Sequence, residues 1–302
     1  MSNVKSQIHI PVLQKEVLEY LNPKPNESFI DCTFGGGGHA LALLEKNGPQ
    51  GMVLGIDADP ELLKTAKDNI QNTEYKNRLV LSCGNFANLK EIAGKEKFAK
   101  VSGILFDLGM SSWHLETSGR GFSFLKKEPL DMRYDTNNHL TAEKILNYWS
   151  VSEIEKILQE FGEERFSQQI AQSILEERKL KPIKNTSQLI EILKRAVPFR
   201  HQHQKLHFAT RTFQALRIAV NDELNSLKNA LPQAIEILKP GGRLALISFH
   251  SLEDRIIKNF LKEKNKENLI IILTKKPVGP KNEEIKINRR SRSAKLRAAE
   301  KL

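Results

Sequence analysis

Four consecutive glycines, Gly35 to Gly38, lie between a short apolar run and a helical pattern, and Asp57 ends the next apolar run. Glycines in such a place let the backbone approach a ligand closely and offer free N–H groups at the start of a helix. Residues 35–40 fit the pattern G-x-G-x-x-G/A, and Asp57 lies 19 residues beyond Gly38, close to the roughly 20 expected for an acid that binds a ribose. The two features predict a site for an adenosyl cofactor.

The glycine loop alone does not separate two classes of enzyme. NAD and S-adenosylmethionine both carry an adenosyl ribose, so a dehydrogenase and a methyltransferase fit the loop equally well. A glycine turn with a purely structural role is a third interpretation, which the acid at the end of the next apolar run makes weaker.

The elements that must position this loop follow from the apolar pattern. Short apolar runs alternate with helical patterns from residue 29 onward, which is typical of βαβ units and a parallel sheet. Asp59 can cap the helix after the second run, with Pro60 at its first position. The runs predict strands at residues 29–33, 52–57, 79–82, 101–107 and 243–249, and a terminal strand at 269–274.

The alternation is interrupted between residues 107 and 243, a gap of 136 residues, whereas a βαβ unit needs only about 30. Apolar residues recur with helical spacing from Thr141 to Arg195, which predicts a compact all-α insertion. A long helix at 212–231 is expected to lead back to the sheet. We therefore predict a first part of the core at 1–115, an inserted helical domain at 116–211, and a second part of the core at 212–302 that ends in a basic tail.

Further motifs follow the glycine loop in register with the predicted strands. GNF follows the third strand at 84–86, ILFDLG ends the fourth at 104–109, and LKPGGRL leads into the fifth at 238–244. This series looks like the serial motifs of class I methyltransferases. Six longer motifs are DCTFGGGGH (31–39), DLGMSS (107–112), RGFSF (120–124), PLDMR (129–133), ATRTFQALRI (209–218) and ISFHSLEDR (247–255). In this order they resemble the 16S rRNA (cytosine-N4)-methyltransferase family, of RsmH or MraW type, over nearly the whole chain.

The resemblance implies a class I, Rossmann-like methyltransferase sheet with an inserted all-α domain that binds the substrate. It also implies S-adenosylmethionine-dependent methylation of N4 of a cytosine in the decoding region of bacterial 16S rRNA, with the small ribosomal subunit as partner. The cofactor contacts that it implies are Gly37, Gly38, His39, Asp57, Phe86 and Asp107.

Two positions depart from the family pattern. His114 stands where the family usually has glutamine, and we keep it as a cofactor contact because histidine can still donate or accept one hydrogen bond. Phe208 stands where the family often has proline. Taken singly, the other contacts have plainer readings: Phe86 as ordinary core, His39 as a helix-start residue and Asp107 as the cap of a turn.

N4 of cytosine is a weak nucleophile because its lone pair is delocalised into the ring, so it must be held in line with the methyl group. Asp107 ends the fourth predicted strand and is our candidate catalytic acceptor for the amine, with Ser111 and Ser112 as candidate substrate contacts. His250 is a further substrate contact, although a capping pair within 251–254 (SLED) that starts the last helix is an alternative.

The charge distribution favours a polyanionic partner. The net charge is +11 and the pI about 9.5. Residues 195–217 hold five Lys or Arg, three His and no acid, and their interleaved phenylalanines suit phosphate contact plus base stacking. We predict RNA contacts at Arg200, Lys205 and Arg211. The basic tail at 288–302 also favours RNA engagement, and a frayed, solvated terminus is the plainer interpretation of it.

The histidines of the basic segment, His201, His203 and His207, lack cysteine or carboxylate partners in sequence, so we prefer RNA contact and expect no metal. The cysteines, Cys32 and Cys83, cannot make a disulfide framework, which favours a reducing, cytoplasmic location. Neither signal peptide nor membrane span is predicted, since the longest aliphatic run, 269–273, is too short.

The positions of the cysteines and lysines discriminate between possible methyl-accepting atoms of the RNA. Methylation at C5 of a pyrimidine requires a thiolate that adds to C6, and neither cysteine is well placed for this. Ribose 2′-O methylation favours a lysine, yet none follows the fourth strand until Lys126. A noncatalytic RNA-binding assembly factor on a methyltransferase fold is the alternative function, and the intact glycine loop and Asp57 argue against it.

Overall fold

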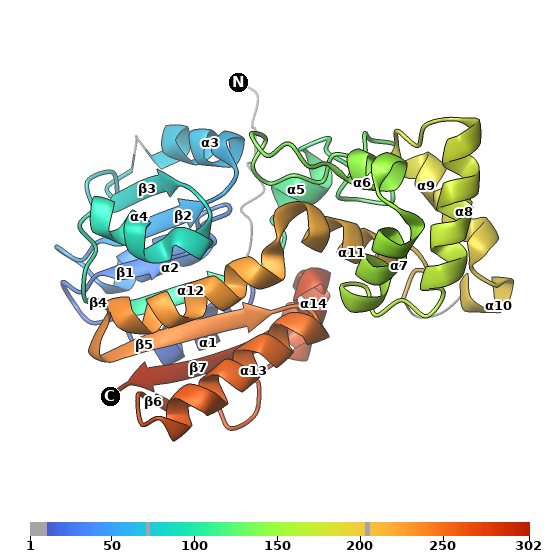
Figure 1. The fold of residues 1–302 in the computed structure, drawn as a ribbon. Coiled ribbons are helices and arrows are strands. Elements are labelled where there is room, and N and C mark those ends of the chain that lie inside the picture. Colours follow the sequence, from blue (N-terminus) through green and yellow to red (C-terminus); the bar gives the residue numbers. More distant parts are fainter. Residues whose placement is uncertain (1–10, 71–72, 203–205) are drawn as a thin grey trace. The chain divides into compact units, whose positions relative to one another are not determined.

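The computed structural model describes residues 11–70, 73–202 and 206–302. The chain divides into two compact units (Figure 1): the first comprises the part up to Gly109 together with Leu224–Leu302, and the second is Met110–Glu223. The second unit therefore begins earlier and ends later than the expected 116–211. The difference arises because α11 (Thr210–Asn221) packs against helices of the second unit, where Phe213, Leu216 and Val220 join its core.

The first unit is built on a seven-stranded sheet in the order β3-β2-β1-β4-β5-β7-β6. Strands β1 to β5 pair in parallel, whereas β7 runs antiparallel to both neighbours. The strands are β1 (Phe29–Asp31), β2 (Val53–Asp57), β3 (Leu79–Cys83), β4 (Val101–Asp107), β5 (Leu238–Ser248), β6 (Ile270–Ile272) and β7 (Lys295–Lys301). The predicted α/β, Rossmann-like class is confirmed. Because β2 and β4 lie on opposite sides of β1, the strand order reverses at β1 and β4.

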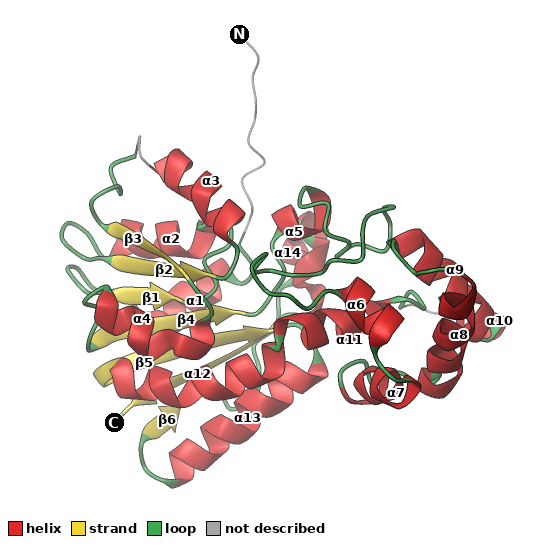
Figure 2. Ribbon diagram, turned by 45° about the horizontal axis from the view of Figure 1, so that its top comes forward, coloured by secondary structure: helices red, strands yellow, loops and turns green. Residues whose placement is uncertain are grey.

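Helices cover both faces of this sheet (Figure 2). One face carries α4 (Leu89–Lys95), α12 (Glu223–Ile237) and α13 (Ser251–Lys266), and the other carries α1 (Gln14–Leu21), α2 (Gly38–Lys46) and α3 (Pro60–Ile70). The short α14 (Asn282–Ile287) and the 3₁₀ turns η1 (Phe86–Asn88) and η2 (Arg289–Ser293) complete the unit. As predicted, Asp59 caps α3: its Oδ1 accepts the N–H of Glu61 at 3.0 Å. Among the described residues, no helix is long and apolar enough to cross a membrane.

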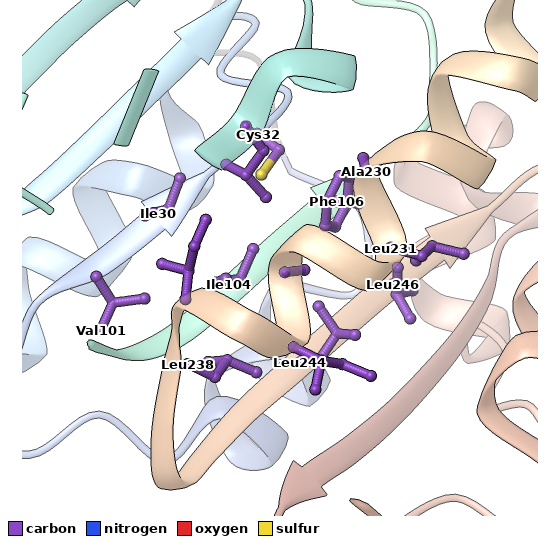
Figure 3. Close-up of a cluster of buried hydrophobic side chains, with 14 of the residues drawn as sticks. Ile30, Cys32, Val101, Ile104, Phe106, Ala230, Leu231, Leu238, Leu244 and Leu246 are labelled. Atoms are coloured by element: carbon purple, nitrogen blue, oxygen red, sulfur yellow. The ribbon is translucent and has the colours of Figure 1, made fainter. Parts of the chain in front are cut away.

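Side chains alternate between the two faces along each central strand, as the two-residue period of a strand requires. In β4, Ile104 and Phe106 pack toward α12, whereas Leu105 packs toward the opposite face. Figure 3 shows the cluster of apolar side chains on the α12 side of the sheet, which also contains Leu244 and Leu246 of β5. Because β1 and β4 are buried on both faces, their carboxyl ends are held in fixed positions.

The C-terminal part of the sheet differs from the prediction in two ways. The strand predicted as terminal is β6, and the chain continues into β7, so residues 295–301 are a central strand rather than a frayed tail. The charges are accommodated by partners distant in sequence: Arg297 Nε donates to Asp254 Oδ1 at 2.7 Å, and Lys301 Nζ donates to the carbonyl of Leu238 at 2.7 Å. Basic residues in this stretch therefore stabilise the sheet.

The helix predicted at 212–231 is two helices, α11 and α12. Asp222 caps α11 with a left-handed backbone (φ 48°), which breaks the helix between them. Aspartate is one of the few non-glycine residues that tolerate this conformation.

The second unit consists of short helices around a core of its own. They are α5 (Ser112–Glu116), α6 (Ala142–Tyr148), α7 (Val151–Glu160), α8 (Ser167–Leu180), α9 (Thr186–Ala196), α10 (Phe199–Gln202) and α11. Capping boxes start two of them: Ser150 with Glu153 begins α7, and Asn185 with Gln188 begins α9. The predicted helical insertion is thus present.

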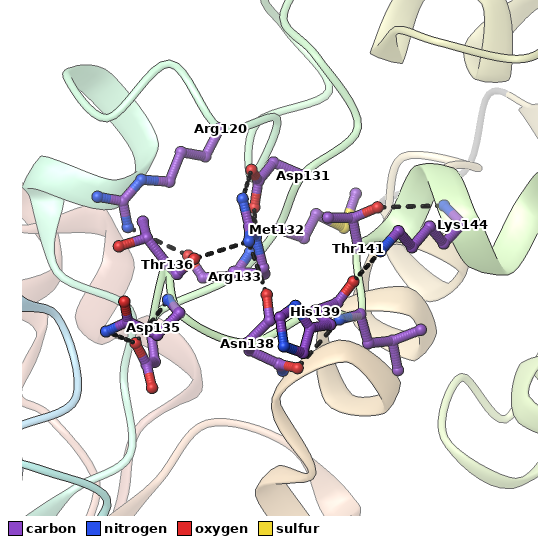
Figure 4. Close-up of polar contacts among 12 residues, drawn as sticks. Arg120, Asp131, Met132, Arg133, Asp135, Thr136, Asn138, His139, Thr141 and Lys144 are labelled. Atoms are coloured by element: carbon purple, nitrogen blue, oxygen red, sulfur yellow. Dashed lines mark hydrogen bonds and ion pairs between the residues drawn. The ribbon is translucent and has the colours of Figure 1, made fainter.

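A loop between α5 and α6 is organised by one arginine (Figure 4). The Arg133 guanidinium donates to both carboxylate oxygens of Asp131, at 2.8 and 2.7 Å, and to the carbonyls of Thr136 and Asn138. Position 121 in the same loop requires a glycine: the φ of Gly121 is 75°, and a Cβ there would lie 2.2 Å from the carbonyl oxygen of Pro129. The motifs at 120–124 and 129–133 therefore have a structural role in this unit.

Candidate cofactor and active site

Six of the predicted site residues lie at one edge of the sheet. Asp57 is the last residue of β2 and Asp107 the last residue of β4, and Phe86 follows β3. Gly37, Gly38 and His39 follow β1 at the start of α2. In open α/β sheets, ligands bind outside the carboxyl ends of the strands where the strand order reverses, here between β1 and β4. Six of the seven residues predicted from the sequence to contact a cofactor therefore lie where open α/β sheets bind ligands, and the seventh, His114, belongs to the second unit.

The glycine loop has a conformation that other residues would disturb. Gly37 has φ 79° and is the N-cap of α2. A Cβ at Gly37 would lie 2.6 Å from Cζ of Phe34, a buried ring beneath the loop. The loop therefore keeps its backbone bare, as close approach to a ligand requires.

The Asp57 carboxylate fixes this loop against the end of β2. Its Oδ2 accepts the N–H of Gly35 at 2.8 Å, and its Oδ1 accepts the N–H of Asp59 at 2.9 Å. A carboxylate has about four acceptor positions on its two oxygens. These two backbone bonds orient the carboxylate at the end of β2.

Three titratable side chains lie together between β1, α2 and β4. Asp31 and His39 are 1% and 6% exposed, and the His39 imidazole Nε2 is 3.4 Å from Asp107 Oδ2. Among the described residues, Oδ2 of Asp31 and both ring nitrogens of His39 lack a hydrogen-bond partner. Buried polar groups are normally paired, so these orphans favour a polar ligand at this edge.

Burial raises the pKa of Asp31 from 3.8 to about 6. Its Oδ1 accepts the N–H of Thr33 at 3.1 Å, and the Thr33 hydroxyl accepts the N–H of Asp107 at 2.6 Å. This chain of bonds joins the ends of β1 and β4. Asp31 is not among the site residues predicted from the sequence, although an acid at the end of a buried strand, shortly before a glycine loop, is a signal that indicates it.

The Phe86 ring is half-buried and packs edge-on against Phe106, with ring centroids 5.6 Å apart. Its turn is fixed by Asn85, whose side chain accepts the N–H of Ala87 at 2.8 Å and donates to Ser226 Oγ at 3.1 Å. The ring is thus both part of the core and partly accessible, and a planar ligand group could stack on it.

Three other predicted residues, His114, Ser111 and Ser112, belong to the second unit. The His114 side chain is buried, its Nδ1 is 2.8 Å from Ser111 Oγ, and its ring packs against those of Phe122 and Tyr134. Within that unit His114 is a core histidine, and its predicted cofactor contact stays a prediction.

His250 has a structural role in the first unit, because it is the N-cap of α13 in a capping box with Glu253. Glu253 Oε2 accepts the N–H of Phe249 at 2.8 Å, and His250 Nε2 lies 3.1 Å from Glu253 Oε1. The alternative capping pair expected within 251–254 is wrong in detail, since Asp254 instead pairs with Arg297. The predicted substrate contact at His250 stays a prediction.

Two of the predicted RNA contacts are described in the second unit. Arg200 is exposed on α10, and Arg211 on α11 donates from Nη1 to the carbonyl of Glu163 at 2.7 Å. Lys205 and His203 lie outside the described residues.

The cysteines differ in environment: Cys83 is exposed, whereas burial raises the pKa of the Cys32 thiol well above its usual range.

Comparison with known proteins gives a consistent result. The model of the MraW methylase family matches residues 6–302. A "Ribosomal RNA small subunit methyltransferase H" from Heliobacterium mobile is 44% identical and covers 97% of this chain and 99% of its own length. The protein of the same name from Dictyoglomus thermophilum is 46% identical, with 100% and 99% covered. An O-methyltransferase from Bacillus cereus, solved in complex with SAH, is 9% identical with a TM-score of 0.46, covering 96% of this chain and 79% of its own.

Proposed function

This chain belongs to the MraW methylase family, and from that premise we propose that it is an S-adenosylmethionine-dependent rRNA (cytosine-N4)-methyltransferase. Its substrate is a cytosine in the decoding region of 16S rRNA within the small ribosomal subunit, and its location is cytoplasmic. The relatives named as small-subunit rRNA methyltransferases support this proposal. The observation that carries it is the set of orphaned polar atoms on Asp31 and His39, beside Asp107 and the glycine loop.

Each residue at the edge suits one part of S-adenosylmethionine, which supplies an electrophilic methyl group when bound. Asp57 holds the ribose hydroxyls through its carboxylate oxygens, which accept hydrogen bonds. Phe86 stacks on the adenine, and Gly37, Gly38 and His39 line the methionine part. His114 is proposed as a further contact from the second unit.

The chemistry asks for positioning rather than for a strong base. An amine that is conjugated with a ring attacks only when it is held in line with the methyl carbon. The target base must leave its stack to reach the site. Asp107 then accepts a hydrogen bond from the N4 amine, and Ser111, Ser112 and His250 hold the base. Arg200, Lys205 and Arg211 contact the RNA backbone.

The experiment that tests the function uses labelled S-adenosylmethionine and small subunits from a strain that lacks the modification. We expect one methyl group per subunit, recovered as N4-methylcytidine by mass spectrometry of the digested RNA. Cys32→Ser and Cys83→Ser should retain most activity, because direct transfer to an amine needs no thiolate. Recovery of 5-methylcytidine, with activity abolished by either serine change, would overturn the assignment. Binding to subunits without methyl transfer would instead favour the noncatalytic assembly factor.

A second expectation concerns the cofactor. Asp57→Ala should weaken S-adenosylmethionine binding by roughly 10- to 150-fold, the equivalent of about 1.5 to 3 kcal/mol for a lost charge-assisted hydrogen-bond pair. Isothermal titration calorimetry measures this directly. Asp68→Ala is the matched control, since Asp68 is an exposed acid on α3. Equal affinity of the two variants, or tight binding of NADH by the unmodified chain, would contradict the cofactor assignment.

A further inference from the structure

The second unit contains a small cavity that is lined in part by Arg211, one of the residues proposed to contact the RNA. It has a volume of about 120 Å³. Residues of the loop before α8 and of the segment leading into α11 line it, among them Arg165, Phe166, His201, His207, Phe208 and Arg211. Pockets for drug-sized ligands usually measure about 300–1,000 Å³. This cavity therefore fits a group such as a single base or a phosphate rather than a whole cofactor.

The charges at the cavity suit an anion. Arg165 is exposed and lines the cavity. Arg211 is held in place by its bond to the carbonyl of Glu163. The acid of the lining, Glu164, is buried, and its Oε1 accepts the N–H of Phe166 at 3.0 Å. Glu164 therefore fixes the loop backbone, and the lining includes two guanidinium groups, those of Arg165 and Arg211, a group that binds phosphate through parallel hydrogen bonds.

Aromatic rings are stacked beside these arginines. The His207 ring lies 4.5 Å from that of Phe124 with an interplanar angle of 5°, and 4.4 Å from that of Phe208 with an angle of 29°. Partial burial lowers the pKa of His207, and its Nδ1 accepts the N–H of Ala209 at 3.2 Å. The His207 ring thus stacks with two phenylalanine rings, those of Phe124 and Phe208. Phe208 lines the cavity and is half-buried, so a further planar group can continue the stack.

We propose that one unpaired nucleotide of the RNA binds at this cavity, with its phosphate on Arg165 and Arg211 and its base stacked on Phe208. The inference rests on the proposed function for the identity of the substrate. Guanidinium groups beside a stack of rings are the combination that single-stranded RNA requires, because phosphates need charge and unpaired bases need a flat surface. An acidic segment of a protein partner would use the arginines and leave the ring stack without a role.

The test measures binding of a fluorescein-labelled, unstructured RNA of about 12 nucleotides to the full chain by fluorescence anisotropy at several salt concentrations. Arg165→Ala should lower the slope of log K against log salt by about 0.7, the value for one phosphate contact on a single strand. Phe208→Leu should weaken binding by roughly 5- to 150-fold and leave the slope unchanged, because it removes a stacked ring and no charge. Circular dichroism melting checks that both variants fold.

Lys179→Ala is the matched control, because Lys179 is an exposed cation of the same unit on α8, outside the cavity. We expect its affinity and salt slope to stay close to those of the unmodified chain. If Arg165→Ala and Phe208→Leu behave like Lys179→Ala, the cavity holds no nucleotide. Displacement of the RNA by a polyglutamate peptide of equal charge would assign the cavity to an acidic protein partner instead. Methyl transfer to small subunits is measured on the same preparation, so a failure of the proposed function is distinguished from a failure of this inference.

Discussion

Asp107→Ala is expected to lower the rate of methyl transfer by about 10²- to 10³-fold, the usual loss when one hydrogen-bond partner of a transition state is removed. The carboxylate is 14% exposed, at the end of a strand that is buried on both faces. Its backbone N–H donates to the Thr33 hydroxyl and keeps that bond in the variant. The substitution removes the acceptor together with its bond to the N–H of Gly109 at 3.3 Å, while the bond to Thr33 still holds the end of β4.

The measurement is a single-turnover assay with saturating labelled S-adenosylmethionine, because Asp107 is also a proposed cofactor contact. Asp107→Asn is the informative companion, since it keeps one acceptor oxygen and removes the charge. We expect its rate to lie between those of the unmodified chain and Asp107→Ala. A rate for Asp107→Ala within about threefold of the unmodified chain would exclude Asp107 as the acceptor and leave the cofactor assignment untouched.

The sequence predicts well those elements whose signals are local. β4 was predicted at 101–107, where an apolar run ends in an acid, and this prediction is confirmed to the residue. The start of α3 was predicted from Asp59 and Pro60, because a cap and its helix lie within a few residues. Placement of Asp57 and Asp107 at one edge follows from parallel pairing, in which all carboxyl ends meet.

The failures concern interactions between residues far apart in sequence. The stretch 295–301 looks like a solvated tail because its charges are evident and their partners are not. Asp254 pairs with Arg297 across 43 positions, and the carbonyl of Leu238 accepts from Lys301 across 63. The break at Asp222 is also hidden, because the apolar period continues on both sides of it.

The candidate site likewise has features that local sequence signals predict and features that depend on residues far apart in sequence. Residue types indicate Gly37, Asp57 and Asp107 as candidates, but they cannot show that the ring nitrogens of His39 are buried without a hydrogen-bond partner. Nor can they show that the Asp31 carboxyl is 1% exposed, because that depends on how β1, α2 and β4 close around it. The ionisation of Asp31 is thus a property of the fold and not of its sequence neighbours.

Because of Asp31, we expect the free energy of unfolding to fall as the pH rises. Because burial raises its pKa from 3.8 to about 6, the folded chain keeps this proton up to about pH 6, whereas the unfolded chain releases it near pH 4. Folding takes up a proton between these values, so stability declines across this window and levels off above it. The difference in pKa corresponds to a cost of about 3 kcal/mol at pH 7 and above. Such a cost is tolerated at a functional site when a ligand compensates for it.

Asp31→Asn should therefore stabilise the ligand-free chain by up to about 3 kcal/mol at pH 7.5 and by little at pH 4, less whatever its new amide N–H groups lose by burial. Urea unfolding of both proteins across this range measures the difference, and Asp68→Asn, on an exposed acid of α3, should show the profile of the unmodified chain.

The same substitution should have the opposite effect on cofactor affinity, which calorimetry measures. Asp31→Asn should bind the cationic S-adenosylmethionine more weakly, because an ionised carboxylate attracts a positive charge and an amide does not. A variant that is more stable above pH 6 yet binds the cofactor as tightly as before would show that the buried charge serves another purpose. Equal stability of the two proteins at pH 4 and at pH 7.5 would mean that Asp31 ionises in the folded chain at its ordinary pKa.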